Sequence, residues 1–281
     1  MRSVRGARLM ISGGASGMGR LYAIRAVTEG AAAVSLWDRD AGGLERIAEE
    51  LAQLSGPRGV GKTRIHTREL DLRSIEAVEL AARETAVAIG VPDILINNAG
   101  IVAGNAYFWE TDNEQVTRAT IEINTLAHCY VTREFLPDMI ADRGRAKRIL
   151  NVSSAASTLA NPRMSMYAAS KWAMTGWSDS LRLELRQAGH HHVRVTTFCP
   201  SYVKTGMFEG ARGMFLTPLL EPDDAVDAAW TAMLRGRAMR LAPRPVWIAR
   251  ALRNVLPVPV WDVLSDWMGV TRSMQQFTGR R

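Results

Sequence analysis

The fold is decided close to the amino terminus by residues 8–20, which read RLMISGGASGMGR. Residues 8–12 contain a short apolar run typical of a buried strand, and the residues after Gly17 have the apolar spacing of a helix. Between them, Gly13 permits a tight turn, Gly17 permits close approach of a ligand to the backbone, and Gly19 lets the helix pack on the sheet. A strand, a glycine turn and a helix in this order predict a site for a nucleotide pyrophosphate at the helix amino terminus.

The same alternation of short apolar runs and longer helical patterns continues along the chain. We expect strands over residues 8–12, 33–37, 64–70, 93–96, 148–152 and 193–198. Helical spacing covers residues 17–29, 41–54, 75–89, 113–140 and 167–187. Strands joined by helices of this length pair in parallel, so we predict an α/β fold: a single-domain Rossmann-type, doubly wound parallel sheet with helices on both faces.

The composition changes near Met207, where we expect the strand–helix alternation to give way to a tail rich in Gly and Pro. This predicts a dinucleotide-binding and catalytic core over residues 1–206. Residues 207–281 would form a substrate flap and a C-terminal helical extension of the same domain. Residues 206–216 place methionines and phenylalanines between glycines, the pattern of an apolar flap that closes over a lipophilic substrate. A plain surface loop is the alternative.

The composition excludes several classes of protein. The chain is 47% hydrophobic and 22% charged, as in ordinary globular proteins. Two cysteines, Cys129 and Cys199, provide neither a disulfide framework nor metal-ligand spacing. The consecutive histidines 190–192 do not share a face, so we expect a solvated turn and no metal site. No apolar run is long enough for an export signal or a spanning helix, and we expect a cytoplasmic protein.

The positive charge is concentrated in the tail. The net charge is +7, and residues 235–281 contain nine arginines against Asp262 and Asp266. A net positive charge suggests nucleic-acid binding, but this excess is confined to a segment that also holds three tryptophans. We therefore expect no nucleic-acid partner. Residues 245–256 and 258–268 are predicted helices, and basic amphipathic helices with tryptophans lie in a membrane interface or pack on the core or on a second subunit.

Asp38 bears on the choice of dinucleotide. It ends the second predicted strand, 19 residues after Gly19. A carboxylate there accepts both ribose hydroxyls of an adenosine and repels a 2′-phosphate, which favours NAD over NADP. The neighbouring Arg39 can pair with a phosphate, so NADP stays as the alternative.

Several polar residues predict proton-transfer chemistry beside this dinucleotide. Tyr167 and Lys171 are four residues apart and share a helix face, where the ammonium would favour the phenolate form of Tyr167. Ser154 follows a strand-like run and can hydrogen-bond a substrate oxygen at the carboxyl edge of the sheet. Residues 97–100 reach the same edge. The amide of Asn124 would be partly buried and needs a partner, either backbone or a relay water.

Together these motifs resemble the short-chain dehydrogenase/reductase family. The resemblance covers roughly residues 9–205, and its motifs are Gly13-x3-Gly17-x-Gly19, Asp71, Asn97-Asn98-Ala99-Gly100, Asn124, Ser154 and Tyr167-x3-Lys171. Two positions depart from the family pattern. Ser12 replaces the usual threonine and keeps the hydroxyl. Ser201 follows Pro200 at a position where glycine is commoner, and this difference would alter the backbone conformation beside the nicotinamide.

The resemblance implies a role for each matched residue. Tyr167 would be the general acid/base, Ser154 would orient the substrate with Ser153 as the lesser candidate, and Lys171 would lower the tyrosine pKa and bind the nicotinamide ribose. Asn124 would hold a relay water. The implied cofactor-binding residues are Gly13, Ser16, Gly17, Met18, Gly19, Asp38, Arg39, Asp71, Leu72, Asn98, Ala99, Gly100, Tyr167, Lys171, Pro200, Val203 and Thr205.

Within this set, the resemblance places Asp71 at the adenine and Pro200, Val203 and Thr205 at the nicotinamide. It implies an NAD-dependent oxidoreductase that interconverts a lipophilic secondary or primary alcohol and its ketone or aldehyde. The alternatives are an NADPH-dependent carbonyl reductase and a non-catalytic dinucleotide-binding scaffold.

The tail adds a looser resemblance. With Gly269, Arg272 and Met274, it resembles family members that act on retinoids, steroids and other lipid alcohols. The family resemblance also implies a homodimer or homotetramer, and the tail leaves a peripheral membrane contact open.

Overall fold

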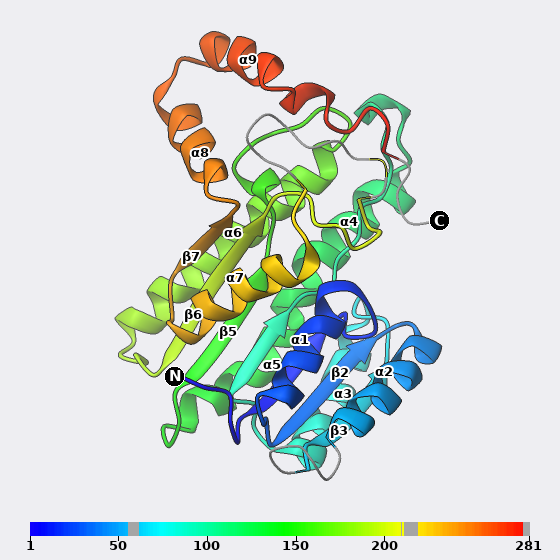
Figure 1. Ribbon diagram of the computed structural model, residues 1–281, viewed down its shortest axis with the longest axis vertical. Helices are drawn as coiled ribbons and strands as arrows, with labels where there is room; N and C mark the ends of the chain where they lie inside the picture. The colour runs from blue at the N-terminus through cyan, green and yellow to red at the C-terminus, as the bar shows by residue number, and fades with distance from the viewer. Residues whose placement is uncertain (56–61, 209, 211–218, 278–281) are drawn as a thin grey trace.

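A computed structural model of the chain describes all residues except 56–61, 209, 211–218 and 278–281. In the described part, seven parallel strands form one sheet in the order β3-β2-β1-β4-β5-β6-β7 (Figure 1). The strands are β1 (Arg8–Ser12), β2 (Ala33–Asp38), β3 (Arg64–Glu69), β4 (Ile94–Asn97), β5 (Lys147–Val152), β6 (Val193–Pro200) and β7 (Met239–Ala242). The predicted Rossmann-type, doubly wound parallel sheet is confirmed. The strand order reverses beside β1, and such a reversal opens a crevice at the carboxyl ends of the strands.

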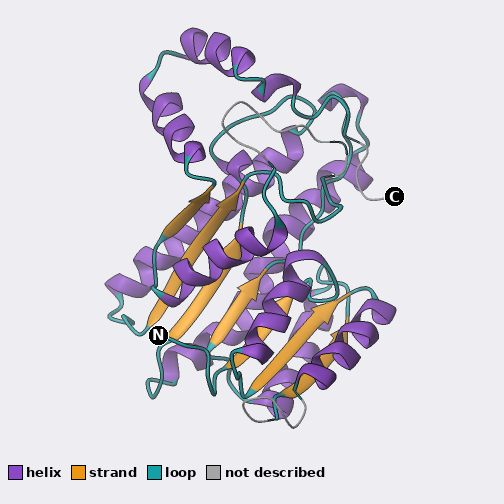
Figure 2. Cartoon of the chain, in the orientation of Figure 1, coloured by secondary structure: helices purple, strands orange, loops and turns teal. Residues whose placement is uncertain are grey.

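Helices cover both faces of the sheet, as Figure 2 shows. They are α1 (Gly17–Thr28), α2 (Ala41–Leu54), α3 (Ile75–Ile89), α4 (Ala119–Ile121), α5 (Ala127–Ala141), α6 (Ser165–Gln187), α7 (Pro222–Leu234), α8 (Pro245–Val255) and α9 (Val258–Trp267). Because successive strand residues point to opposite faces, Leu9 and Ile11 belong to a core with α1, α2 and α7. Met10 belongs to the other core, with α3, α5 and α6.

Burial on both faces explains why the central strands were predicted from sequence. β4 and β5 are buried at every residue, so they appear as continuous apolar runs. β3 lies at an edge and has no buried residue, although a strand was predicted at residues 64–70.

The expected end of strand–helix alternation near Met207 is wrong. The chain adds one more helix and strand, α7 and β7, and β7 pairs in parallel with β6, with Met239 opposite Thr197. β7 was missed because it is a four-residue edge strand whose first two residues are only half-buried. Of the flap expected over residues 206–216, residues 209 and 211–216 lie outside the described part of the chain.

The predicted helix over residues 113–140 contains two π-helical turns. They are η2 (Asn113–Arg118) and η3 (Glu122–Leu126), which flank α4 and precede α5. π-Helical turns inside α-helices frequently occur at functional sites because they re-aim side chains. Asn124 lies in the second of these turns.

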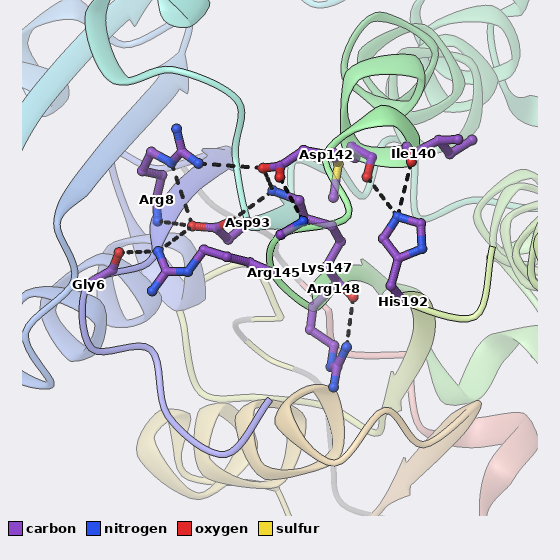
Figure 3. A network of polar contacts seen from close by, with 11 residues as sticks. Gly6, Arg8, Asp93, Ile140, Asp142, Arg145, Lys147, Arg148 and His192 are labelled. Carbon is purple, nitrogen blue, oxygen red and sulfur yellow. Dashed lines mark hydrogen bonds and ion pairs between the residues drawn. The ribbon is translucent and has the colours of Figure 1, made fainter.

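A buried ion-pair network closes the edge of the sheet opposite to the crevice (Figure 3). The fully buried Asp93, just before β4, accepts hydrogen bonds from Lys147 Nζ at 2.9 Å and Arg145 Nη1 at 3.1 Å. It also accepts from the backbone N–H of Arg8 at 3.0 Å. Since Arg8 and Lys147 begin β1 and β5, the network ties together the amino ends of three strands.

Candidate active site

A cavity of about 510 Å³ lies at the carboxyl edge of the sheet. Its lining includes every residue of the predicted cofactor set except Gly19, together with Ser154. These residues come from the glycine turn, from the ends of β2, β3, β4, β5 and β6, which parallel pairing brings to one edge, and from α6. Asn124 does not line the cavity.

The glycine turn forms a cradle of bare backbone. Gly13 and Gly17 have φ angles of +66° and +54°, which L side chains rarely adopt. A Cβ on Gly13 would lie 2.8 Å from the Cα of Ala99, and one on Gly19 would lie 1.9 Å from the carbonyl oxygen of Gly13. Gly19 therefore supports the turn from behind without reaching the cavity. A cradle free of side chains at the start of α1 fits a dinucleotide pyrophosphate.

The Ser12 hydroxyl holds this turn against the segment after β4. Its oxygen accepts hydrogen bonds from the backbone N–H groups of Asn98 at 3.1 Å and Ala99 at 3.3 Å. In return, Asn98 Nδ2 donates to the carbonyl oxygens of Ser12 at 3.2 Å and Gly13 at 3.0 Å. The substitution of serine for threonine at position 12 thus keeps a hydroxyl that bridges two walls of the cavity.

At the end of β2, the Asp38 carboxylate is anchored to the glycine turn. Oδ2 accepts from the backbone N–H of Ala15 at 3.0 Å, and Oδ1 accepts from that of Asp40 at 3.2 Å. Arg39 is exposed beside it, and both side chains line the cavity. This end of the cavity therefore presents a fixed carboxylate and an adjacent guanidinium.

Asp71 lines the same end of the cavity and pairs with Arg73. The guanidinium Nη2 lies 2.5 Å from the Asp71 carboxylate. The Arg73 hydrogen bonds hold the pKa of Asp71 below its usual value, and the charge of Arg39 adds to this shift. Asp71 is therefore an anion beside the cavity.

Tyr167, Lys171 and Ser154 meet near the middle of the cavity. Tyr167 and Lys171 are one turn apart on α6, and both are buried. Lys171 Nζ donates to the carbonyl oxygen of Val152 at 3.1 Å and lies 5.8 Å from the centre of the Tyr167 ring. Ser154 lines the cavity with Tyr167, and its hydroxyl accepts from the backbone N–H of Ala156 at 3.1 Å. The structure thus brings these three side chains together.

Burial dominates the electrostatics of the pair. It raises the pKa of Tyr167 above its usual value of 10, and the hydrogen bond with Ser154 offsets only part of this rise. Burial also lowers the pKa of Lys171 to about 8. A lowering of the Tyr167 pKa by Lys171, whose Nζ lies 5.8 Å from the ring centre, stays a prediction, since burial is the largest influence on this phenol. Tyr167 is therefore a neutral phenol at neutral pH, able to donate a proton.

Asn124 acts as a backbone clamp behind the cavity wall. Its Oδ1 accepts from the backbone N–H of Ile101 at 2.8 Å, and its Nδ2 donates to the Ile101 carbonyl oxygen at 2.9 Å and to Ser170 Oγ at 3.1 Å. A Cβ on Gly100 would lie 3.3 Å from Asn124 Oδ1 and 3.6 Å from Lys171 Nζ. The amide has backbone partners, and a relay water at Asn124 stays a prediction.

Sequence reasoning missed an apolar cluster over Tyr167. The Phe208 ring packs edge-on to Tyr167 with centroids 6.1 Å apart, and it also packs 5.2 Å from Tyr202 and 6.4 Å from Phe277. Phe208 and Phe277 line the cavity, and Met274 packs in the same cluster. The phenylalanines and methionines of the tail were visible in the sequence, but not their position above Tyr167.

Asparagines and a tyrosine hold residues 270–277, which we call the strap, in place over the cavity. Asn105 Nδ2 donates to the carbonyl oxygens of Met274 at 2.8 Å and Phe277 at 3.2 Å. Asn161 Nδ2 donates to Tyr202 Oη at 2.8 Å and Ser273 Oγ at 3.2 Å. The hydroxyls of Tyr202 and Ser273 lie 2.9 Å apart. These contacts make the strap part of the cavity wall.

The described residues contain neither a metal-binding cluster nor a membrane-spanning helix. No cluster of three His, Cys, Asp or Glu side chains could hold a metal ion there. Within the same residues, no helix combines the length and the apolar character that crossing a bilayer requires.

Comparison with known proteins gives a consistent result. Residues 8–214 match the short chain dehydrogenase family. The whole chain is 31% identical to epidermal retinol dehydrogenase 2 of Mus musculus, over 88% of that protein, and 30% identical to retinol dehydrogenase 10-B of Danio rerio, over 87% of that protein. A crystal structure of a short chain dehydrogenase/reductase from Burkholderia phymatum in complex with NAD has the same fold. It superposes with a TM-score of 0.79 at 24% identity, over 90% of this chain and 95% of that one.

Proposed function

This chain belongs to the short-chain dehydrogenase family, and on that premise we propose that it is an NAD-dependent oxidoreductase. It interconverts a lipophilic secondary or primary alcohol and its ketone or aldehyde. One observation carries the proposal: Ser154, Tyr167 and Lys171 meet in the same cavity as a bare glycine cradle. A scaffold that only binds a dinucleotide needs the cradle but not the other three side chains.

The cofactor assignment rests on the residues at the two ends of the cavity. Gly13 and Gly17 would hold the pyrophosphate, and Pro200, Val203 and Thr205 would face the nicotinamide. The Asp38 carboxylate, fixed by Ala15, favours ribose hydroxyls over a 2′-phosphate, which supports NAD. When bound, the nicotinamide supplies or accepts the hydride of the reaction.

The side chains near Tyr167 handle the proton and the substrate oxygen. The Ser154 hydroxyl orients the oxygen, and Tyr167 gives a proton to it as the phenol or takes one from it as the phenolate. Lys171, held by the Val152 carbonyl, places a cationic group behind Tyr167 and within reach of a ribose. Asn124 holds the backbone at Ile101, so the wall between Gly100 and Lys171 keeps its shape.

The substrate class follows from the apolar cluster over Tyr167. Phe208 and Phe277 line the cavity and belong to one apolar cluster with Tyr202 and Met274, so an apolar substrate would displace water from the site. Both relatives compared above carry retinol in their names, which supports a retinoid, steroid or comparable lipid alcohol.

A substrate panel tests the proposal. Retinoid, steroid and medium-chain alcohols are assayed by the appearance of NADH, with the matching ketones or aldehydes and NADPH as the second arm. Tyr167→Phe is expected to lower turnover about 10²- to 10⁴-fold, because it removes the proton donor. Its dissociation constant for NAD should stay within a few-fold of the parent value. Tyr130→Phe, which changes a half-buried tyrosine on α5, serves as the control and should keep full activity.

The results separate the alternatives. Turnover mainly of carbonyl compounds with NADPH would favour the carbonyl reductase over the alcohol dehydrogenase. Dinucleotide binding without turnover on any panel member would favour the scaffold. Full activity of Tyr167→Phe on a genuine substrate would remove Tyr167 from the mechanism.

We also propose that the enzyme is a homodimer or homotetramer and that it acts in the cytoplasm or at a membrane surface. The family premise supports the oligomer. Light scattering on the purified chain tests the assembly, and cell fractionation tests the location.

A further inference from the structure

The tail helix α8 presents an apolar face to solvent. Trp247, Ile248, Leu252 and Val255 share one side of this helix by its 3.6-residue period, and all four are exposed, Trp247 at 63% and Val255 at 81%. Val246, on the opposite side, is the one buried residue of α8. A surface helix usually buries its apolar stripe in the core, so the exposed stripe of α8 needs another partner.

The two arginines within α8 lie on the side of the helix away from this apolar stripe. These residues, Arg250 and Arg253, are only half-exposed. Arg244, at the start of the helix, is exposed on the same side as Trp247 and Ile248. The apolar stripe of α8 is thus exposed to solvent together with the Arg244 side chain.

The helix α9 continues the apolar surface. Val260 and Val263 are exposed on one side, and Trp261 and Ser265 are buried on the other. Figure 1 shows α8 and α9 projecting past the carboxyl ends of β6 and β7, away from the sheet. The two helices therefore lie at the same end of the molecule as the cavity.

A second apolar surface lies on the other side of the strap. Phe108 and Trp109, in the short helix η1 (Phe108–Glu110), are exposed, Trp109 at 79%. Tyr107 stacks on Trp109 with centroids 4.9 Å apart. Asn105, just before them, holds the strap through Met274 and Phe277. The strap that covers the cavity thus runs from the α9 surface to the η1 surface.

We propose that α8, α9 and η1 together dock the protein on a lipid surface that contains anionic headgroups. Residues 244–277, which include α8, α9 and the strap, contain four arginines against two aspartates, a net positive charge complementary to such headgroups. Exposed tryptophan beside arginine is the pattern of helices that lie in a membrane interface. Two separate apolar surfaces on either side of one strap fit a deformable lipid layer. Docking in this orientation points the covered cavity at the lipid.

Vesicle binding tests the proposal independently of the proposed enzymatic activity. The full chain is sedimented with vesicles of phosphatidylcholine, with and without phosphatidylglycerol. We expect binding to the phosphatidylglycerol vesicles, weakened by added salt. The double variant Ile248→Gln with Val255→Gln should lose at least about tenfold in partitioning, because it removes two apolar side chains from the contact.

A matched double variant provides the control. Leu80→Gln with Val87→Gln changes two exposed residues at the same spacing on α3, where Val87 is 88% exposed. It should bind vesicles like the parent. Thermal unfolding of both variants shows that they are folded. A second variant, Trp109→Gln, should weaken binding separately through the η1 surface.

Three outcomes would overturn the proposal. The parent protein could fail to bind either kind of vesicle. The α8 double variant could bind as well as the parent. Light scattering could also show a dimer that only the α8 double variant disrupts, without vesicle binding, and the apolar stripe would then be an interface between two copies of this chain.

Discussion

The ammonium nitrogen of Lys171 lies 3.1 Å from the carbonyl oxygen of Val152, the last residue of β5. This hydrogen bond ties α6 to the edge of the sheet where the cavity opens. Both partners are buried, and burial lowers the pKa of Lys171 to about 8, because a charged amine loses its hydration there. A side chain that is charged at pH 7 and neutral at pH 9 therefore lies behind Tyr167.

The titration of Lys171 can be measured directly. The chain has only four lysines, at positions 62, 147, 171 and 204, so ¹³C-lysine labelling gives four side-chain signals. The signal missing from the Lys171→Gln spectrum should titrate with a midpoint of about 8. A midpoint above 10 would contradict the burial argument.

The same shift has a consequence for stability. The folded pKa of Lys171 lies below its ordinary value of 10.5, so between pH 8 and pH 10.5 the unfolded chain binds more protons than the folded one. The contribution of Lys171 to the free energy of unfolding should therefore increase with pH across this window. Chemical denaturation of the parent and of Lys171→Met at several pH values measures that difference, and parallel pH curves would refute it.

Asp38 should set the preference between NAD and NADP. We expect the parent to bind NAD more tightly than NADP, because the carboxylate repels a 2′-phosphate. Asp38→Asn keeps an acceptor for the Ala15 N–H and removes the charge, so it should shift the ratio of the two dissociation constants toward NADP by about tenfold. Titration of both cofactors by calorimetry checks this. Equal or tighter NADP binding by the parent would reverse the assignment.

Gly19 should tolerate no side chain, although it lies in a helix. Alanine is normally better than glycine there by about 0.5–1 kcal/mol, and Gly176→Ala in α6, where a Cβ meets nothing within 4 Å, should show that gain. A Cβ on Gly19 would instead lie 1.9 Å from the carbonyl oxygen of Gly13. Gly19→Ala should therefore distort the glycine cradle and weaken dinucleotide binding at least about tenfold. Unchanged binding would mean that the turn relaxes freely.

Asp93 should be the most costly ion-pair residue to remove. Asp93→Ala leaves the fully buried Lys147 ammonium with the partly exposed Asp142 as its remaining carboxylate partner, and breaking a buried pair costs up to about 3–5 kcal/mol. Glu50→Gln, which breaks a half-exposed pair with Arg20, should cost less than about 1 kcal/mol. Urea denaturation measures both values, and similar losses would show that Lys147 finds other compensation.

The strap should control substrate size. Asn161→Ala removes the hydrogen bonds to Tyr202 and Ser273 that hold it over the cavity. We expect kcat/KM for a bulky lipid alcohol to fall about tenfold, with a smaller effect for a short alcohol that does not reach the strap. Gln276→Ala, an exposed position on the strap, is the control. An equal loss for both alcohols would indicate a general loss of structure.

Much of the fold and part of the site could be predicted because the signals are local. Parallel strands end at one edge, so residues placed directly after strands, such as Gly13, Asp38 and Ser154, converge there whatever the rest of the chain does. Tyr167 and Lys171 share a helix face by spacing alone. Ser12 ends β1, and its hydroxyl therefore lies at the same edge, where it accepts hydrogen bonds from Asn98 and Ala99.

Other features could not be predicted from local patterns. β7 is too short and too exposed to produce an apolar run, and it is a strand because β6 offers it a partner. The protonation state of Tyr167 depends on how completely the surrounding side chains exclude water. The spacing of residues in the sequence does not reveal this.

The amino-acid sequence by itself determined the order of strands and helices up to β6, the glycine cradle and the shared helix face of Tyr167 and Lys171, because each depends on residues within a few positions of one another. Only the tertiary structure decided what covers the cavity and which helix faces stay in solvent. Asn105 meets Met274 and Asn161 meets Ser273 across more than one hundred residues of chain. Such contacts form only when the whole sheet and its tail have packed, so no short stretch of sequence contains them.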